Sequence, residues 1–171
     1  MKKILFIALF PVLCHLATTA QEKNAPDNLK HDATEMGAAF LKEDYKTFVH
    51  YSHPKIVTMM GGQDKMAGSL SQMIEGMKRK GMAFLNITFG EPSKLIKAGA
   101  EWQCTLPQRT EIQMPDGKIR VTSTLIAISS DNGRHWVFVD TSNKDIAAIK
   151  KVLPNISSAI VIPPPQPPVR L

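Results

Sequence analysis

Residues 101–140 read EWQCTLPQRTEIQMPDGKIRVTSTLIAISSDNGRHWVFVD, and this stretch decides the fold class. Two turn signals, Pro115-Asp116-Gly117 and Asp131-Asn132-Gly133, interrupt segments rich in β-branched and aromatic residues. Pro107 marks a distortion or an edge position, because proline donates no ladder hydrogen bond. The predicted strands are Glu101–Met114, Ile119–Ser129 and His135–Asp140, and together they form an antiparallel meander.

The segment before this meander also has a strand-like period of two. Apolar side chains alternate along Met82–Phe89, which predicts a further strand. Gly90-Glu91-Pro92 interrupts it, and we expect Lys94–Lys97 to resume the strand after a bend or bulge. A turn at Lys97–Ala100 then leads into the meander.

Helical periodicity dominates the chain before residue 82. Leu29–Leu41 carries an apolar stripe, and Asp44 is the expected cap of a shorter helix that ends before His53-Pro54. Asp64 is the expected cap of a third helix, which ends at Gly81. Between the second and third helices, Lys55–Met60 is rich in β-branched residues and predicts a short strand. Helices that precede an antiparallel sheet can cover only one of its faces, so the predicted class is α+β.

The first twenty residues have the layout of a secretory signal peptide. Met1-Lys2-Lys3 is basic, Ile4–Leu16 is apolar, and Ala17-Thr18-Thr19-Ala20 supplies small residues before a cleavage point. The apolar run is shorter than the ~20 residues of a membrane-spanning helix, and no later stretch approaches that length. We expect cleavage after Ala20, a periplasmic or extracellular location, and no transmembrane segment in the mature chain.

Composition and charge exclude several protein classes. Apolar residues make up 43% and charged residues 21% of the 171 residues, which is typical of a soluble globular domain and not of a disordered chain. Loss of Lys2 and Lys3 lowers the formal charge from +6 to +4, and the remaining basic residues are scattered, so nucleic acid is not an expected partner. Cleavage leaves Cys104 as the single cysteine, which excludes an intramolecular disulfide.

The C-terminal part predicts one more helix and then a tail. Ser142 and Asp145 form a capping arrangement for a short helix that stops at Pro154. Beyond it, Pro163–Pro168 must be extended. The predicted organisation is a signal peptide (1–20), a flexible lead-in (21–28), one domain (29–154) and an extended proline-rich tail (155–171).

This order of elements resembles the nuclear transport factor two-like superfamily, which includes ketosteroid isomerases and scytalone dehydratase. The resemblance covers Leu29 to about Asp140. It is carried by 37–49, Met59-Met60-Gly61-Gly62, Gly90-Glu91-Pro92 and 129–136, which are similar to small exported bacterial members without an assigned activity. The resemblance implies a cystatin-like cone, with a sheet wrapped around a cavity that the helices close. Members use this cavity in different ways, so the fold alone implies no activity.

Residues 129–136 match the S-x-D-x-G-x-x-W pattern known as an Asp-box. The physics of this pattern is structural. The carboxylate of Asp131 can accept turn amides, Gly133 can take a positive φ, and Trp136 can pack beneath the turn. We interpret the motif as a structural hairpin.

Several other polar residues are candidate metal ligands or catalytic groups. His50 and His53, with His31 or Cys104, could offer ligands to a metal, and Cys104 could be a nucleophile only with a lowered pKa. We favour a buried core role for Cys104 and expect no metal and no cofactor. The candidates for proton transfer are Tyr45, His50, Tyr51, Glu101 and Asp140. None of them matches a catalytic position of the superfamily, so no catalytic residue is assigned.

The favoured function is that of an exported, non-enzymatic domain with a small apolar ligand as the candidate occupant of its cavity. Methionine and aromatic side chains give an adaptable pocket lining. The predicted pocket residues are Phe40, Phe48, Met59, Met73, Phe84 and Trp102. The alternatives are a cavity enzyme of the isomerase or dehydratase type and a homodimeric interaction module. The polar sheet face that includes Gln103 and Thr105 favours a wet interface or plain solvent.

Overall fold

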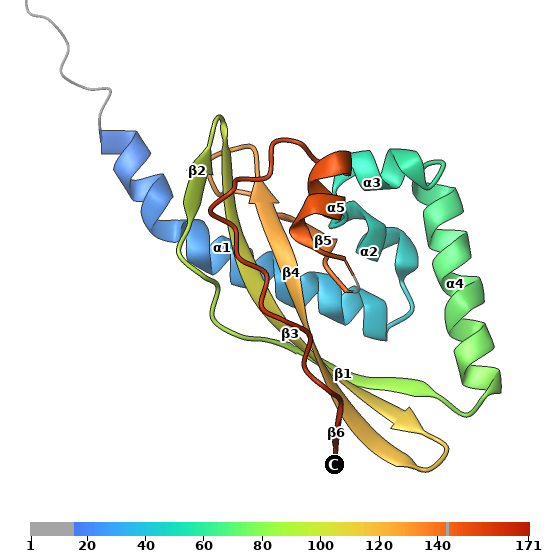
Figure 1. Ribbon diagram of the computed structural model, residues 1–171. Helices are drawn as coiled ribbons and strands as arrows, with labels where there is room; N and C mark the ends of the chain where they lie inside the picture. Colours follow the sequence, from blue (N-terminus) through green and yellow to red (C-terminus); the bar gives the residue numbers. More distant parts are fainter. Residues whose placement is uncertain (1–15, 143) are drawn as a thin grey trace, which may run out of the picture.

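A computed structural model describes residues 16–142 and 144–171, with side chains from Asn24 onward (Figure 1). It consists of N-terminal helices packed against an antiparallel sheet, which confirms the α+β class. Within the described residues the sheet has six strands and does not close on itself. Most of the predicted signal peptide, residues 1–15, lies outside the described residues.

The sheet is built around two long strands. β3 (Glu101–Met114) and β4 (Gly117–Ser129) pair continuously from Trp102 opposite Ser129 to Met114 opposite Gly117. The other strands are β1 (Ala83–Phe89), β2 (Ile96–Ala98), β5 (Val137–Asp140) and β6 (Val169–Arg170). The main strand order is β1-β3-β4-β5, with β2 paired to β3 and β6 paired to β4. The predicted meander and its two turns are confirmed.

Proline is tolerated inside β3 because of where it lies. Pro107 sits beyond the end of β1, and its carbonyl accepts the Gly90 N–H at 2.9 Å. The N–H and C=O of one strand residue face the same side, so the ring nitrogen of Pro107 faces the irregular link between β1 and β2. The missing donor therefore falls where the ladder is already interrupted.

The helices begin at α1 (Leu16–Leu41), which is longer than predicted. Residues 21–28 are helical, so the prediction of a flexible lead-in is wrong. Ala25 is fully buried, and Asn28 Nδ2 donates to the Gly133 carbonyl at 2.8 Å. The polar composition of this segment masked a helix whose few small residues pack against the β4–β5 turn.

The segment that follows the second helix also differs from the prediction. α2 (Tyr45–His50) begins at the predicted cap, where the Asp44 carboxylate accepts Thr47 N–H at 3.1 Å. The predicted strand at Lys55–Met60 is instead α3 (Pro54–Met59). His53 Nδ1 accepts the Lys55 N–H at 3.2 Å, and Pro54 occupies the first helical turn. This capping outweighs the β propensity of the segment.

Two further caps differ from prediction. α4 (Gln63–Arg79) starts after Gly62, and Asp64 lies in its first turn rather than at the cap. Gly81 has a φ of 74°, as expected for a residue that ends a helix. α5 (Ile146–Val152) is capped by Asp145, which accepts Ala148 N–H at 2.7 Å, whereas Ser142 bonds to Asp140 instead.

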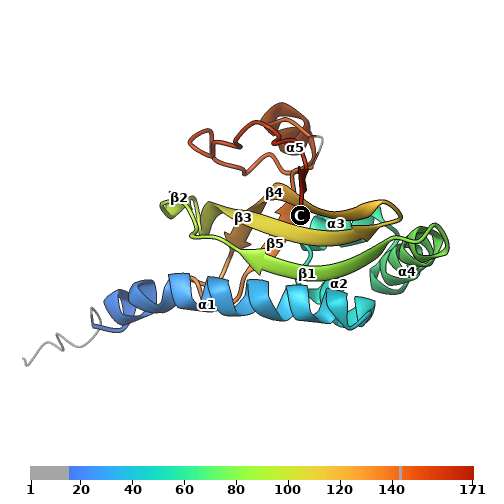
Figure 2. The same ribbon diagram turned by 90° about the horizontal axis from the view of Figure 1, so that it is seen from below.

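Two layers cover the sheet (Figure 2). α1 lies along one face, and α5 with the C-terminal segment (residues 155–171) lies along the other. Alternation along β4 separates the two cores: Leu125 and Ala127 pack toward α1, while Ile126 and Ile128 pack toward α5. A third cluster lies among α2, α3 and α4 and includes Val49, Val57 and Ile74.

The C-terminal segment covers the sheet face expected to be a wet interface or open to solvent, and that expectation is wrong for Gln103 and Thr105. Gln103 is fully buried; its Oε1 accepts Ser157 N–H at 2.9 Å and its Nε2 donates to the Asn155 carbonyl at 3.1 Å. The segment ends as β6, whose Val169 and Arg170 pair with Arg120 and Ile119. None of the helices in the described part is long and apolar enough to span a membrane.

Candidate functional site

A cavity of about 530 Å³ opens between the sheet and the helices. Residues from both faces of the sheet contribute to its wall, because Leu125 and Phe138 belong to the core beneath α1, whereas Val139 and Ile149 belong to the core beneath α5. Its apolar wall residues come from α1 to α5 and from the three strands β1, β4 and β5: Met36, Gly37, Phe40, Phe48, Ile56, Met59, Met66, Leu70, Met73, Phe84, Ile87, Leu125, Phe138, Val139, Ala148, Ile149 and Val152. Its polar wall residues are Ser52, Gln108, Thr110, Asp140 and Lys144.

Five of the six predicted pocket residues line this cavity: Phe40, Phe48, Met59, Met73 and Phe84. Trp102 does not. It packs against the core beneath α1, and Lys97 Nζ lies 4.7 Å from the centroid of its ring. Six strand positions separate Trp102 from Gln108 on the cavity wall, which amounts to roughly 20 Å. Alternation placed Trp102 on a plausible face but could not give its distance along the strand.

An aromatic group holds one side of the cavity in place. The ring of Phe40 meets those of Phe84, Phe48 and Tyr45 edge to face, with centroid distances of 4.9, 5.4 and 6.0 Å. Edge-to-face pairs are favourable because the positive edge of one ring meets the negative face of the other. This side of the wall is therefore fixed.

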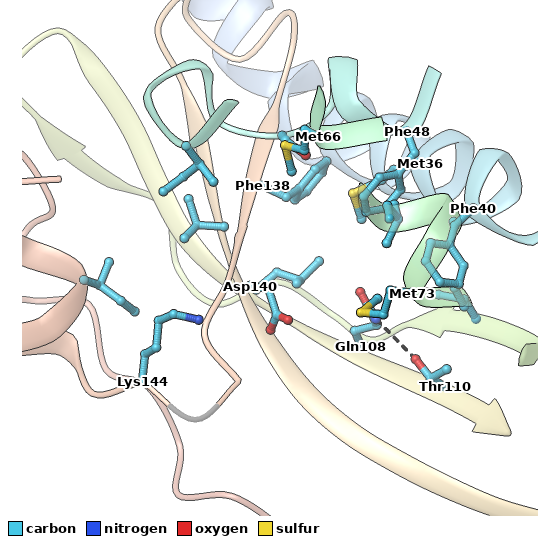
Figure 3. Close-up of a pocket in the computed structure, with 18 of the residues that line it drawn as sticks. Met36, Phe40, Phe48, Met66, Met73, Gln108, Thr110, Phe138, Asp140 and Lys144 are labelled. Carbon is cyan, nitrogen blue, oxygen red and sulfur yellow. Dashed lines mark hydrogen bonds between the residues drawn. The ribbon is translucent and has the colours of Figure 1, made fainter. Parts of the chain in front are cut away.

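Methionine side chains provide an adaptable part of the wall. Met59 on α3 and Met73 on α4 are 62% and 53% exposed although both line the cavity. Met36 and Met66 also reach the wall (Figure 3). Unbranched thioether side chains can rearrange around ligands of different shape. Met66 and Leu70 share the α4 stripe with Met73, so the helical period could have identified them as wall residues.

The polar wall groups come from β3, β5, the segment before α5 and the segment between α2 and α3. Gln108 Nε2 donates to Thr110 Oγ1 at 3.2 Å. Asp140 accepts Ser142 N–H at 2.8 Å and Ser142 Oγ–H at 2.7 Å, both through Oδ1. In Figure 3 the Lys144 side chain extends toward Asp140. Strand alternation from buried Leu106 could have indicated Gln108 and Thr110, whereas Lys144 carries no such signal.

Of the candidates for proton transfer, Asp140 alone lies on this wall. Tyr45 is buried in the cluster of α2 and α4, and burial raises the pKa of its phenol. Burial likewise raises the pKa of Tyr51, whose carbonyl accepts the Phe138 N–H at 2.7 Å. His50 is exposed at the end of α2. Glu101 accepts Gln103 Nε2–H at 2.8 Å and lines a separate hollow of about 140 Å³ beside His53.

The histidine and cysteine candidates are not brought together. His53 Nδ1 serves as the cap of α3, and burial lowers the pKa of this imidazole. Cys104 is fully buried in the core beneath α1, where burial raises the pKa of its thiol to about 12. A thiol with such a pKa is a poor nucleophile at neutral pH. The described residues contain no group of three His, Cys, Asp or Glu side chains arranged to hold a metal ion.

The Asp-box residues build the β4–β5 turn. Asp131 Oδ1 accepts the backbone N–H groups of Arg134 and His135 at 3.1 and 3.0 Å, and Asp131 Oδ2 lies 2.6 Å from His135 Nδ1. Trp136 is 1% exposed, and its backbone N–H donates to Asp32 Oδ2 of α1 at 2.8 Å. Burial is the largest influence on the pKa of Asp32 and raises it. The carboxylate of Asp131 accepts turn amides and Gly133 has a positive φ, as predicted, and the backbone N–H of Trp136 also joins the turn to α1.

Comparison with known proteins identifies no relative of this chain. Neither a family model, nor a curated protein, nor a solved structure matches it. The cavity and its wall are therefore the basis for assigning a function.

Proposed function

We propose that the protein is an exported domain of the nuclear transport factor two-like class that binds a small apolar ligand in the cavity between its helices and its sheet. The observation that carries the proposal is an open cavity of about 530 Å³ whose wall is mostly apolar. Ligand pockets commonly measure ~300–1,000 Å³ and combine an apolar lining with a few polar groups. A wall that combines packed aromatic rings with adaptable methionine side chains suits an apolar molecule.

Blocking the cavity mouth tests this proposal. Ala148 is exposed on α5 and lines the cavity, whereas its neighbour Ala147 is exposed and does not line it. Ala148→Trp should abolish binding of the apolar dye N-phenyl-1-naphthylamine, measured by fluorescence titration, and Ala147→Trp should leave it unchanged. A wild-type protein that does not bind the dye, or equal binding by both variants, contradicts the proposal.

Export is tested separately. A basic start, a short apolar segment and Ala17-Thr18-Thr19-Ala20 support cleavage after Ala20. N-terminal sequencing of protein from fractionated cells should begin at Gln21, in the periplasmic or extracellular fraction. A chain that starts at Met1 in the cytosol contradicts export.

The alternative of a cavity enzyme gains one supporting observation. Asp140 is the only carboxylate on the described wall of the cavity and could act as a base. Isomerase or dehydratase chemistry also needs an opposing tyrosine or other acid to hold an enolate; neither Tyr45 nor Tyr51 is a wall residue, and Lys144 lies beside Asp140 rather than opposite it. We therefore favour binding over catalysis.

A homodimer is the remaining alternative. Assembly through the sheet face of Gln103 would require the C-terminal segment to leave that face. Light scattering of residues 21–171 distinguishes a monomer from a dimer.

A further inference from the structure

We propose that the ligand of this cavity is a neutral alcohol or phenol, an apolar molecule whose hydroxyl group lies between Asp140 and Lys144. This inference rests on the proposed function and names the ligand class of the same site. It follows from three properties of the polar wall: a fixed acceptor, an adjacent donor and a net charge of zero.

The fixed acceptor is the carboxylate of Asp140 at the end of β5. Both of its hydrogen bonds with described residues use Oδ1, which holds the N–H and the hydroxyl of Ser142. These two bonds orient the carboxylate and leave Oδ2 available. A carboxylate oxygen can only accept, so the group that meets Oδ2 must be a donor.

The adjacent donor is the ammonium of Lys144. Its backbone N–H donates to the Thr141 carbonyl at 3.0 Å, which closes the turn that brings the lysine back beside Asp140. Figure 3 shows its side chain extended along the cavity toward Asp140. Within the described residues no ion pair of 4.0 Å or less joins Asp140 and Lys144. A ligand group can therefore lie between an unused acceptor and an unused donor.

The charge of the wall selects among possible groups. Asp140 and Lys144 are the only charged residues among the described wall residues, so the wall has no net charge. A ligand carboxylate would meet Lys144 but also the like charge of Asp140, and an ammonium group would meet the reverse. A hydroxyl donates to Oδ2 and accepts from Nζ, so it uses both wall groups and meets no like charge.

Four matched probes test this inference: 2-naphthalenemethanol, 2-naphthoate, 2-naphthylmethylammonium and 2-methylnaphthalene. They share one apolar body and differ in the group attached to it. Calorimetric titration of residues 21–171 should show the alcohol binding tightest, about five- to tenfold tighter than the hydrocarbon, as expected for one net hydrogen bond at a solvent-exposed position.

Charge-changing variants should reorder the probes. Asp140→Asn leaves Lys144 alone, so the carboxylate should bind tightest. Lys144→Met leaves Asp140 alone, so the ammonium should bind tightest; this side chain is exposed, so its loss does not endanger the fold. Lys151→Met is the matched control, because Lys151 is exposed on α5 and is not a wall residue.

The outcomes separate the two proposals. If no probe binds, the proposed function and this inference are both wrong. If the probes bind with equal affinity, or if the variants leave the order unchanged, binding in the cavity stands and the hydroxyl assignment is overturned.

Discussion

Asp131 holds the β4–β5 turn with a single side chain, and its titration should be visible in stability. Burial alone would raise the pKa of this carboxyl, but hydrogen bonds from His135 and Ser129 outweigh it and lower the pKa from 3.8 to about 2. A group whose pKa is lowered by folding stabilises the protein above its unfolded pKa. That contribution is lost as the pH falls from about 4 to about 2.

Asp131→Asn should therefore destabilise the protein most at neutral pH. We expect a loss of about 1 kcal/mol at pH 7, because one charge-assisted bond to His135 disappears from a partly exposed site where water screens charge. Urea unfolding at pH 7, 4 and 2.5 should show this difference shrinking toward the lowest pH. Asp27→Asn, at an exposed position of α1, is the control and should show no such convergence. A difference that is independent of pH contradicts the role of the carboxylate charge.

Gly133 in this turn should not tolerate a side chain. Its φ is 81°, and an added Cβ would overlap the Cβ of buried Ala25. Gly133→Ala combines left-handed strain of about 1 kcal/mol with a clash of about 1–3 kcal/mol. Gly68→Ala is the matched control, because Gly68 lies at an exposed position of α4 with open space around it. This substitution should stabilise the helix by up to about 1 kcal/mol. Chemical denaturation measures both, and equal effects would refute the close approach of α1 to the turn.

Among the elements, the C-terminal segment offers the sharpest comparison, because two adjacent residues differ completely in burial. Ile160 is 4% exposed and packs with Ile156 and Leu153, whereas Val161 is 74% exposed. Ile160→Ala should cost about 2–4 kcal/mol in the free energy of unfolding, and Val161→Ala less than about 0.5 kcal/mol. Thermal and urea unfolding provide the measurement. If both changes are silent, the segment does not dock on the sheet in solution.

Local signals were sufficient to predict the elements where turn chemistry and periodicity agreed. The long hairpin of β3 and β4 followed from Pro115-Asp116-Gly117, and α2 followed from Asp44. α3 was missed because Ile56, Val57 and Thr58 favour strands, while the deciding signal was the capping of one turn by His53. Single-turn elements depend on such contacts more than on average propensity.

At the scale of the whole molecule, the fold should not depend on the predicted signal peptide. Among the α1 residues whose side chains are described, Ala25 is the first buried one; it lies at zero exposure beside the β4–β5 turn. A chain that starts at Gln21 should match the full-length protein in stability within about 0.5 kcal/mol. A chain that starts at Lys30 also loses Leu29 and the Asn28 bond to Gly133, and should lose at least about 3 kcal/mol. Equal urea midpoints for the two truncations would show that α1 contributes nothing before Lys30.

The cavity was partly predictable from the sequence. Phe40, Phe48 and Met73 follow from helical stripes, since an amphipathic helix must turn its apolar side inward. Asp140 and Lys144 reach the same wall although they lie at the end of β5 and in the segment before α5. That arrangement depends on which faces the helices leave uncovered, and no local pattern encodes it.

Cys104 is a built-in probe of local opening of the core. It is the only cysteine after residue 20, it is fully buried, and its pKa is raised to about 12. A thiol reagent in the surrounding solution can modify it only when β3 separates from α1. The rate of labelling therefore reports how readily the core around Cys104 opens under native conditions, without added denaturant. When the labelling rate is measured with a ligand bound, it shows how far occupancy of the cavity suppresses this local opening.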